Sequence, residues 1–400
     1  MDYDIIIIGA GPAGLAFARS VGESGLRVAM VELQERDQLA QPAVDGRDIA
    51  LTHLSVDILA GLGAWERIGD EQVSPILEAR VVDGDSPYRL SFDTPRGATE
   101  PLGFLVSNHL LRGALFAVVE PLENVELITG TRVTGVDLST QRGGVRLEDG
   151  RELSAPLIVA ADNRFSSTRR MVGIGADMRD FGREAIVGWM EHEQPHENVA
   201  HECFHYGRTL AVLPMPGNVS SIVVTAPSDQ AEALMDLSPE AYAADIEARL
   251  GGELGAMKMV GERHRYPLVA VHARRFVRER FALVGDAAVG MHPVTAHGFN
   301  LGLSGQDLLS KQLLQAHRAG RDLGGLSVLR PYERQHMQVS RPLFHGTNGI
   351  VGLFTDDRLP AKLLRKAVLR ASDHIAPVKW LIRGKLTTKR HGLGFPLPLF

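Results

Sequence analysis

The stretch MDYDIIIIGAGPAGLAFARSVGESGLRVAMVE, residues 1–32, decides the fold. Its apolar, β-branched run at 5–8 is typical of a buried strand, and an apolar helical pattern follows at 15–21. A second strand pattern at 27–32 ends on an acid. A glycine-rich turn separates the first strand from the helix, and this order predicts a Rossmann-like α/β unit.

The glycine turn, residues 9–14, carries the G-x-G-x-x-G spacing of dinucleotide-binding proteins. Gly9 is expected to make the tight turn, Gly11 to admit a pyrophosphate, and Gly14 to let the helix pack on the strand. The positive end of the helix dipole would face the phosphates. Glu32 is placed to accept hydrogen bonds from a ribose, and its charge disfavours a 2′-phosphate. A glycine turn without any ligand is the alternative. The predicted cofactor contacts are Gly9, Gly11, Pro12, Ala13, Gly14 and Glu32.

Composition narrows the possible functions. A chain of 400 residues predicts two domains or one large one, and a formal charge of −5 gives no case for nucleic acid. Cys203 is the only cysteine, which excludes an intramolecular disulfide and a multi-cysteine metal site. The histidines between 201 and 272 lack the spacing of metal ligands, so we expect no metal. We identify neither a signal peptide nor an apolar run that could span a membrane, and expect a cytoplasmic protein.

Two further strand patterns also end on acids. The apolar run after Pro156 ends at Asp162, with Arg169 seven residues later. The run at 281–284 ends at Gly285-Asp286, and a histidine- and glycine-rich segment follows at 292–302. Asn163 stands directly after the first acid, and asparagine readily adopts the positive φ that such a turn can need.

The remaining pattern alternates helices with short strands. Helical patterns occupy residues 54–62, 108–119, about 239–250 and 303–319, and helical structure follows from 329. Strands are expected at 125–127, 131–138 and 145–147 as a meander, and at 186–190, 200–206, 210–213 and 220–224 as a β-rich block. Residues 75–107 predict a hairpin turning at Asp83-Gly84.

Together, these motifs resemble the single-component flavin monooxygenases of the p-hydroxybenzoate hydroxylase fold. The segments Arg47 to Trp65 and Gly285 to Gly302 are most similar to the ubiquinone-biosynthesis hydroxylases UbiH, UbiF and UbiM. His297 in place of the usual glutamine, together with the basic C-terminus, most resembles the UbiM type. The resemblance implies an α/β fold with a Rossmann-like FAD-binding domain, an inserted β-sheet substrate domain and a C-terminal helical segment. The expected bounds are 1–73, 107–179 and 271–325 for the FAD domain, 74–106 and 180–270 for the substrate domain, and 326–400 for the helical region.

The resemblance also assigns residues. Further FAD contacts are implied at Arg47, Arg112, Asp162, Arg169, Gly285, Asp286, Pro293, Gly298, Phe299 and Asn300. His292, Pro293 and His297 are expected beside the flavin on the substrate side. The chain departs from the family pattern at Asn163, Ala296, His297 and Gly305.

The implied chemistry is aromatic hydroxylation. In this family NAD(P)H reduces bound FAD, and the reduced flavin reacts with O2 to form a C4a-hydroperoxide that oxygenates an electron-rich ring. The expected substrate is a polyprenylated phenol or quinol intermediate of ubiquinone biosynthesis, hydroxylated at a ring carbon such as C5. The alternatives are hydroxylation of a small soluble phenol, with Arg208 as a candidate carboxylate partner, a non-redox prenyl-binding protein, and a reductase of prenyl double bonds.

The C-terminal segment is basic. Nine lysines and arginines lie between Lys362 and Arg390, with Asp373 as the only acid there. Helical spacing places Lys362, Lys366 and Arg370 on one face, which predicts a basic amphipathic helix. An anionic membrane surface, such as the inner face of a bilayer, is one expected partner, and a protein of ubiquinone biosynthesis is the other. An ordinary solvated helix is the alternative.

Overall fold

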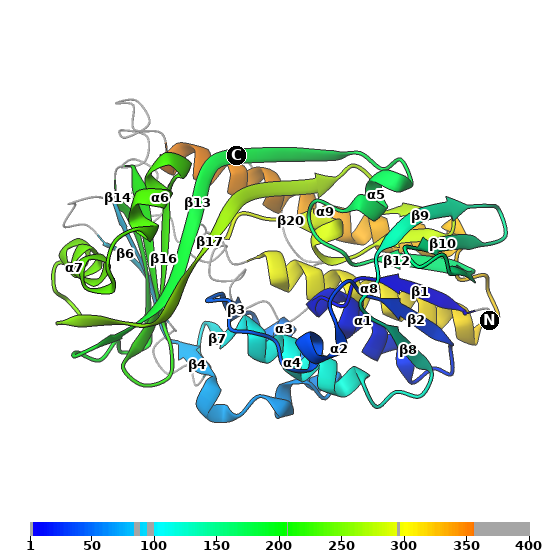
Figure 1. Cartoon of the computed structure of the whole chain (residues 1–400), viewed down its shortest axis with the longest axis horizontal. Helices are drawn as coiled ribbons and strands as arrows, with labels where there is room; N and C mark the ends of the chain where they lie inside the picture. The colour runs from blue at the N-terminus through cyan, green and yellow to red at the C-terminus, as the bar shows by residue number, and fades with distance from the viewer. Residues whose placement is uncertain (1–2, 84–88, 94–99, 206, 294–296, 356–400) are drawn as a thin grey trace.

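A computed structural model describes residues 3–83, 89–93, 100–205, 207–293 and 297–355. In Figure 1 a mostly parallel sheet with its helices forms one half of the molecule, and a large, mostly antiparallel sheet forms the other. The α/β fold predicted from the sequence is therefore confirmed.

The parallel sheet forms around the first predicted strand. The strand order is β18-β19-β12-β1-β2-β8, and all neighbours are parallel except β18 and β19. The central strands are fully buried, which explains their unbroken apolar runs. The bounds are β1 Ile5–Ile8, β2 Val28–Val31, β8 Val125–Ile128, β12 Leu157–Ala160, β18 Val277–Arg278 and β19 Phe281–Leu283.

Helices cover this sheet. The helix α1 (Pro12–Gly22) packs against α4 (Asn108–Val119) and α8 (Gly298–Arg318), and α8 in turn packs against α9 (Leu326–Thr355). Buried apolar side chains of these helices join those of the strands in one core. The start of α8 at Gly298 is five residues earlier than the sequence pattern indicated.

A small antiparallel sheet adjoins the parallel one. Its strands are β9 (Val133–Leu138), β10 (Gly143–Leu147) and β11 (Glu152–Ala155). The predicted meander is correct for β9 and β10 but wrong for residues 125–127, because β8 pairs in parallel with β2 instead. A short apolar strand carries no sign of which sheet it will join.

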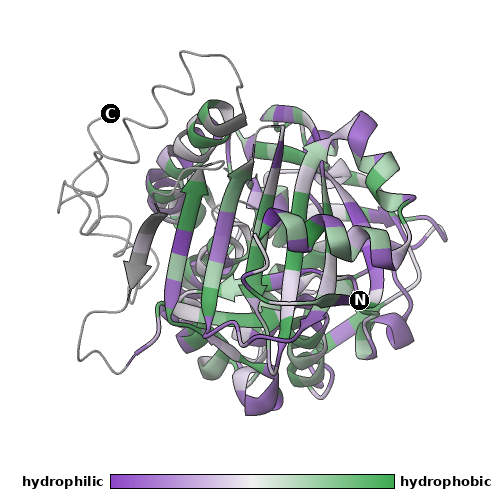
Figure 2. Ribbon diagram, turned by 90° about the vertical axis from the view of Figure 1, so that its left-hand side faces the viewer, coloured by the Kyte–Doolittle hydropathy of each residue, from purple (hydrophilic) through white to green (hydrophobic). Residues whose placement is uncertain are grey.

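The large sheet holds eight strands in the order β20-β17-β13-β16-β15-β14-β5-β6. Several of its strands carry alternating hydrophobic and hydrophilic bands in Figure 2. One face packs on α6 (Ser228–Met235) and α7 (Pro239–Arg249). The strands are β5 Glu78–Asp83, β6 Arg89–Asp93, β13 Ala176–His192, β14 Val199–His205, β15 Arg208–Pro214, β16 Val219–Pro227, β17 Met257–Ala273 and β20 Val289–Gly290.

Strands β13 and β17 join the two halves. Each runs for 17 residues, and in Figure 1 they extend from the large sheet toward the parallel one. Both strands continue across the domain bounds expected at 179/180 and 270/271, although their pairing shifts register between Asp180 and Glu184. The division at these residues remains a prediction. The predicted hairpin pairs β5 with β6, while its turn lies outside the described residues.

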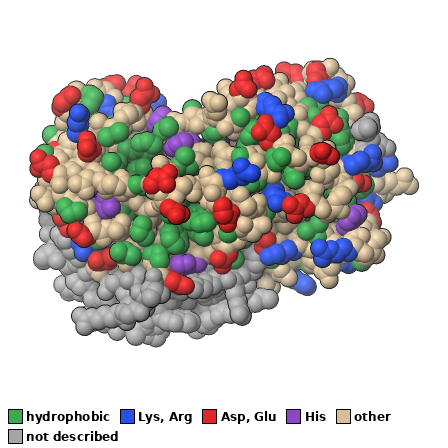
Figure 3. Space-filling view, turned by 90° about the horizontal axis from the view of Figure 1, so that it is seen from below, with side chains coloured by type: hydrophobic (Ala, Val, Ile, Leu, Met, Phe, Trp, Pro, Cys, Tyr) green, Lys and Arg blue, Asp and Glu red, His purple; other side chains and the backbone are tan. Residues whose placement is uncertain are grey.

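A further, smaller sheet connects the two halves. Strands β3 (Asp48–Leu51), β7 (Gly103–Ser107) and β4 (Ser74–Ile76) form an antiparallel sheet, and α3 (His53–Gly61) follows β3. The short helices are α2 Arg36–Ala40, α5 Ser167–Met171, η1 Trp65–Arg67, η2 Asp70–Gln72 and η3 Gly285–Ala287. Viewed from below, the surface is notched between two lobes (Figure 3).

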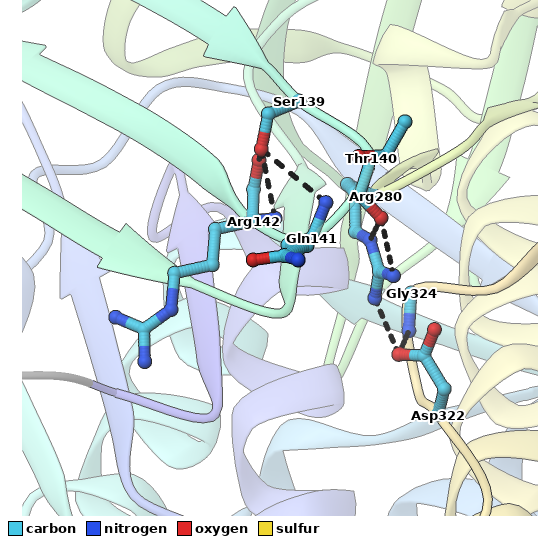
Figure 4. A network of polar contacts seen from close by, with 7 residues as sticks. All are labelled: Ser139, Thr140, Gln141, Arg142, Arg280, Asp322 and Gly324. Carbon is cyan, nitrogen blue, oxygen red and sulfur yellow. Dashed lines mark hydrogen bonds and ion pairs between the residues drawn. The ribbon is translucent and has the colours of Figure 1, made fainter.

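Arg280 links three loops by hydrogen bonds and an ion pair (Figure 4). Its buried side chain donates to the carbonyl oxygen of Thr140 at 2.7 and 3.0 Å and pairs with Asp322, while its backbone N–H donates to Gly324. Arg280 has a φ of +66°, a conformation that costs a non-glycine residue about 1–2 kcal/mol. These bonds hold it there.

The C-terminal prediction concerns residues beyond Thr355. The basic segment from Lys362 to Arg390 lies outside the described residues. Over the described part of the chain, no helix has the length and hydrophobicity needed to cross a membrane.

Candidate functional site

The predicted motifs meet at one edge of the parallel sheet. Strands β19, β12, β1 and β2 are neighbours, and carboxyl ends of parallel strands lie at the same edge. The residues after them are Gly285, Asp162, Gly9 and Glu32. All four line a cavity of about 770 Å³ that extends to the large sheet. The position matches the ligand site of doubly wound folds.

The glycine turn has the geometry that its spacing predicts. Gly9 has a φ of +105°, and a Cβ there would lie 2.6 Å from the carbonyl oxygen of Ala161. A Cβ on Gly14 would lie 2.1 Å from the carbonyl oxygen of Gly9, so helix and turn touch. Gly11 has open space at its Cβ position and faces the cavity. The turn therefore presents bare backbone beside the first turn of α1, as a pyrophosphate site requires.

Glu32 is fixed by the same turn. Its carboxylate accepts hydrogen bonds from the backbone N–H of Ala10 at 2.6 Å and of Gln34 at 2.9 Å. Arg112, on α4, donates to the side chain of Gln34 at 2.8 Å. These contacts place an acid and an arginine at the same end of the cavity.

Asp162 has an acceptor atom that no described residue uses. Its Oδ2 accepts from the hydroxyl of Thr168 at 3.1 Å and its backbone N–H at 3.4 Å, while its buried Oδ1 has no hydrogen-bond partner. Burial raises the pKa of this carboxyl group, although the nearby side chains of Ser166 and Thr168 oppose the rise. A donor from a cofactor would satisfy Oδ1, so the residues present fit FAD at this position.

The expectation for Asn163 needs correction. Asn163 is not among the residues with positive φ. Its side chain instead accepts from the backbone N–H of Phe165 at 2.8 Å, an Asx turn that reverses the chain without a left-handed residue.

Asp286 and Arg164 form an ion pair at 3.0 Å on the cavity wall. Arg164 also donates to the carbonyl oxygen of Val269. The preceding Gly285 has a φ of +61° and packs so closely that a Cβ would lie 2.7 Å from that of Ala13. The third motif is therefore packed directly on the first turn of α1.

Arg47 lies where β3 meets the cavity. Its guanidinium pairs with Asp45 at 2.6 Å and lies 5.2 Å from the ring centre of Tyr266. Burial acts to raise the pKa of Asp45, but hydrogen bonds from Arg47 and Asn108 outweigh it and lower the pKa. The pair therefore stays ionised. Arg47 also lines the cavity, where its guanidinium group would donate hydrogen bonds to FAD.

His292 is buried beside the cavity. Its ring meets Phe181 edge to face, with centres 4.8 Å apart. Burial, together with Arg183, Arg164 and Arg179, lowers the pKa of His292 to about 4. The imidazole is therefore uncharged at neutral pH. Pro293, Gly298 and Phe299 line the cavity next to it.

Four predicted residues lie outside the cavity lining: Gly14, Arg169, His297 and Asn300. Arg169 is buried and donates to the carbonyl oxygens of Ala287 and Arg164, so it ties two of the motif turns together. Asn300 accepts from Ser55 at 2.6 Å and donates to the carbonyl oxygen of Ala50 at 2.8 Å. It thereby fixes the start of α8 to β3. Direct contact of these four with a cofactor remains a prediction.

The cavity also contains acids that the motifs do not reveal. Asp48 accepts from Ser107 at 2.6 Å and from the indole N–H of Trp189 at 2.8 Å, and burial raises its pKa. Glu202, on β14, lies on the wall formed by the large sheet. Its only sequence signal is an acid at the centre of an apolar strand.

The large sheet supplies an uncharged wall around Glu202. Its cavity-lining residues alternate along β15 and β16 and are otherwise small or apolar, namely Thr209, Ala211, Leu213, Val223 and Thr225. Arg208 belongs to the opposite face, where it lies 3.6 Å from Asp245 of α7. Among the described residues, no group of three or more potential metal ligands is present.

Comparison with known proteins matches the model of the FAD binding domain family to residues 2–343. The chain is 47% identical to the ubiquinone hydroxylase UbiM of Neisseria meningitidis over 388 residues, covering 96% of this chain and 84% of that protein. It is 36% identical to the ubiquinone hydroxylase UbiL of Rhodospirillum rubrum, covering 98% and 89%. The structure of p-nitrophenol 4-monooxygenase PnpA from Pseudomonas putida shares the fold, with a TM-score of 0.76, 17% identity and coverage of 97% and 99%.

Proposed function

Since the chain belongs to the FAD binding domain family and is a flavin-dependent aromatic monooxygenase, we propose that it hydroxylates a polyprenylated phenol or quinol in ubiquinone biosynthesis. The observation that carries the proposal is the cavity, which joins a dinucleotide site to an uncharged sheet wall. Identity of 47% with a ubiquinone hydroxylase over nearly the whole chain supports the substrate class.

Different residues of the cavity would bind the cofactor and the substrate. The turn at 9–14, Glu32 and Arg112 would hold the adenosine diphosphate end of FAD, and Asp286 the ribityl chain. Bound FAD, reduced by NAD(P)H, supplies the activation of O2 for transfer of one oxygen atom. The neutral His292 and Pro293 would border the reacting ring, and the start of α8 at Gly298 offers backbone N–H groups to negative charge.

The substrate wall favours a ring without an ionised substituent. None of the sheet residues that line the cavity is an arginine or lysine. Arg208, the candidate partner for a substrate carboxylate, points to the opposite face and lies beside Asp245. Hydroxylation of a small phenol that carries a carboxylate is therefore the weaker alternative. A prenylated phenol brings an apolar tail and a neutral hydroxyl group instead.

We keep C5 as the proposed position of hydroxylation, with either nicotinamide as reductant. A membrane surface or a partner protein remains the proposed docking site for the basic segment from Lys362 to Arg390. The prenyl-binding and double-bond reductase alternatives predict no hydroxylated product.

The test is coupling of reductant consumption to substrate. Purified enzyme with FAD should oxidise NAD(P)H slowly alone, and severalfold faster when a prenylated phenol is added. The fraction of electrons recovered as hydrogen peroxide should fall at the same time, because the ring captures the oxygen. Stimulation by 4-hydroxybenzoate but not by the prenylated phenol would favour the small-phenol alternative. A colourless protein with no reductant oxidation would contradict the proposal.

A further inference from the structure

Glu202 is the only acid on the part of the large sheet that lines the cavity, among the described residues. Strand register places it opposite Ala211 of β15 and Val81 of β5. Ala211 in turn lies opposite Val223 of β16, so the acid lies within a row of apolar residues. A carboxyl group in this row faces the space where we place the substrate ring.

Over the described part of the chain, Glu202 has no polar partner. No hydrogen bond or ion pair joins it to any described residue, and the side chains of Val81, Thr209 and Ala211 beside it carry no charge. Burial alone raises the pKa of Glu202 to about 8. At neutral pH most of the carboxyl groups are therefore protonated, with an O–H donor and a carbonyl acceptor side by side.

A merely structural acid would be expected to have partners. Asp48, another half-buried acid in this cavity, accepts hydrogen bonds from Ser107 and Trp189. Glu202 is half-buried on the cavity wall, where a ligand that fills the cavity would supply the partner that the neighbouring side chains do not. We propose that Glu202 binds the hydroxyl group of the substrate ring, its carbonyl oxygen accepting the phenolic O–H and its own O–H donating to the phenolic oxygen.

This assignment rests on the proposed function and makes the substrate class narrower. A neutral phenol completes both hydrogen bonds, whereas an O-methylated ring cannot donate to Glu202. A ring with a carboxylate near Glu202 would place a negative charge against this wall, whose cavity-lining residues include no lysine or arginine. Glu202 would therefore select a ring with a free hydroxyl group and no ionised substituent at this end.

Two probes isolate the hydroxyl group: 2-allylphenol and its methyl ether, 2-allylanisole. Binding to the FAD-loaded enzyme is measured without NAD(P)H, from the change in flavin absorbance, so catalysis does not enter. The readout is the ratio of the two Kd values. A change in the cavity that weakens binding of both ligands equally leaves this ratio unaltered. Glu202→Leu removes both hydrogen-bonding groups, and Glu202→Gln keeps a donor and an acceptor. Glu191→Leu, the same change at an exposed position of β13, is the matched control.

At pH 7 we expect the wild-type enzyme and the Glu191→Leu control to prefer the phenol by about tenfold. The preference should persist within threefold in Glu202→Gln and fall to about one in Glu202→Leu. Raising the pH through 8 should increase the wild-type preference, because an ionised carboxylate is the stronger acceptor, and leave Glu202→Gln unchanged.

An unchanged preference in Glu202→Leu, or no preference in the wild-type enzyme, would overturn the assignment. The two proposals fail in different ways. If the wild-type enzyme hydroxylates a prenylated phenol while Glu202→Leu retains the preference, only the role of Glu202 is wrong. If the wild-type enzyme forms no hydroxylated product, the proposed function is wrong whatever the binding ratio.

Discussion

At the residue scale, Glu202 affects folding as well as binding. Its pKa is raised from 4.5 to about 8 by burial, so the folded state holds its proton more tightly than the unfolded chain. Below pH 4.5 Glu202 is protonated in both states and does not change the free energy of unfolding. Between pH 4.5 and pH 8 this free energy falls progressively, because only the unfolded chain releases the proton. The residue therefore costs stability where the enzyme would work, as active-site groups often do.

Glu202→Gln should reverse this cost. We expect the free energy of unfolding to rise by about 1–3 kcal/mol at pH 8 and by less than 1 kcal/mol at pH 5, because the amide never ionises. Urea unfolding of both proteins at the two pH values measures the difference. An equal effect at both pH values would show that the carboxyl group is not held neutral by the fold.

Single residues also show what the sequence could predict. Gly9, Gly14 and Gly285 were identifiable because each belongs to a short motif directly after an apolar strand, even though Gly9 and Gly285 pack against the distant residues Ala161 and Ala13. Glu202 and Asp48 were not, because their environments depend on strands that pair across more than a hundred residues. The turn at Asn163 was expected on the right residue, but it uses a different conformation.

At the element scale, two glycines of the turn at 9–14 have different roles, because one is needed for folding and the other for cofactor binding. A methyl group on Gly14 meets the carbonyl oxygen of Gly9 at 2.1 Å, so Gly14→Ala must push α1 away from its turn. A methyl group on Gly11 meets nothing within 4 Å and projects where the pyrophosphate would lie. Gly11 has a φ of −70°, which alanine adopts without strain.

The two substitutions should therefore act differently. Gly14→Ala is expected to lower the free energy of unfolding of the FAD-free protein by about 1–3 kcal/mol. Gly11→Ala should change it by less than about 0.5 kcal/mol, yet weaken FAD binding roughly tenfold or more. Urea unfolding and titration with FAD measure the two effects. Loss of stability in Gly11→Ala comparable to that in Gly14→Ala would contradict this separation.

Elements were predicted best where the pattern was local. The helix α4 begins and ends as its pattern indicated, at Asn108 and Val119. The sequence pattern does not indicate the short strand β3, directly after Arg47, because four residues of mixed character give little periodicity. Pairing with β7 makes it a strand.

At the scale of the whole molecule, the two halves share one reaction site. Strands β13 and β17 run through both, and the bond from Trp189 to Asp48 ties the large sheet to β3 beside the cavity. The cofactor would be held by one half and the ring by the other, so their separation is set by strands rather than by a flexible linker. Sequence patterns indicated both halves but could not place strands that cross between them.

We propose that this site transfers an oxygen atom from O2 to a prenylated aromatic ring. The most direct test is to incubate the FAD-loaded enzyme with NAD(P)H, a prenylated phenol and ¹⁸O2, and to determine the mass of the product. We predict one added oxygen atom, carrying the heavy isotope, on a ring carbon. A product without the label, with the oxygen on the prenyl chain, or with only a reduced double bond would contradict the account.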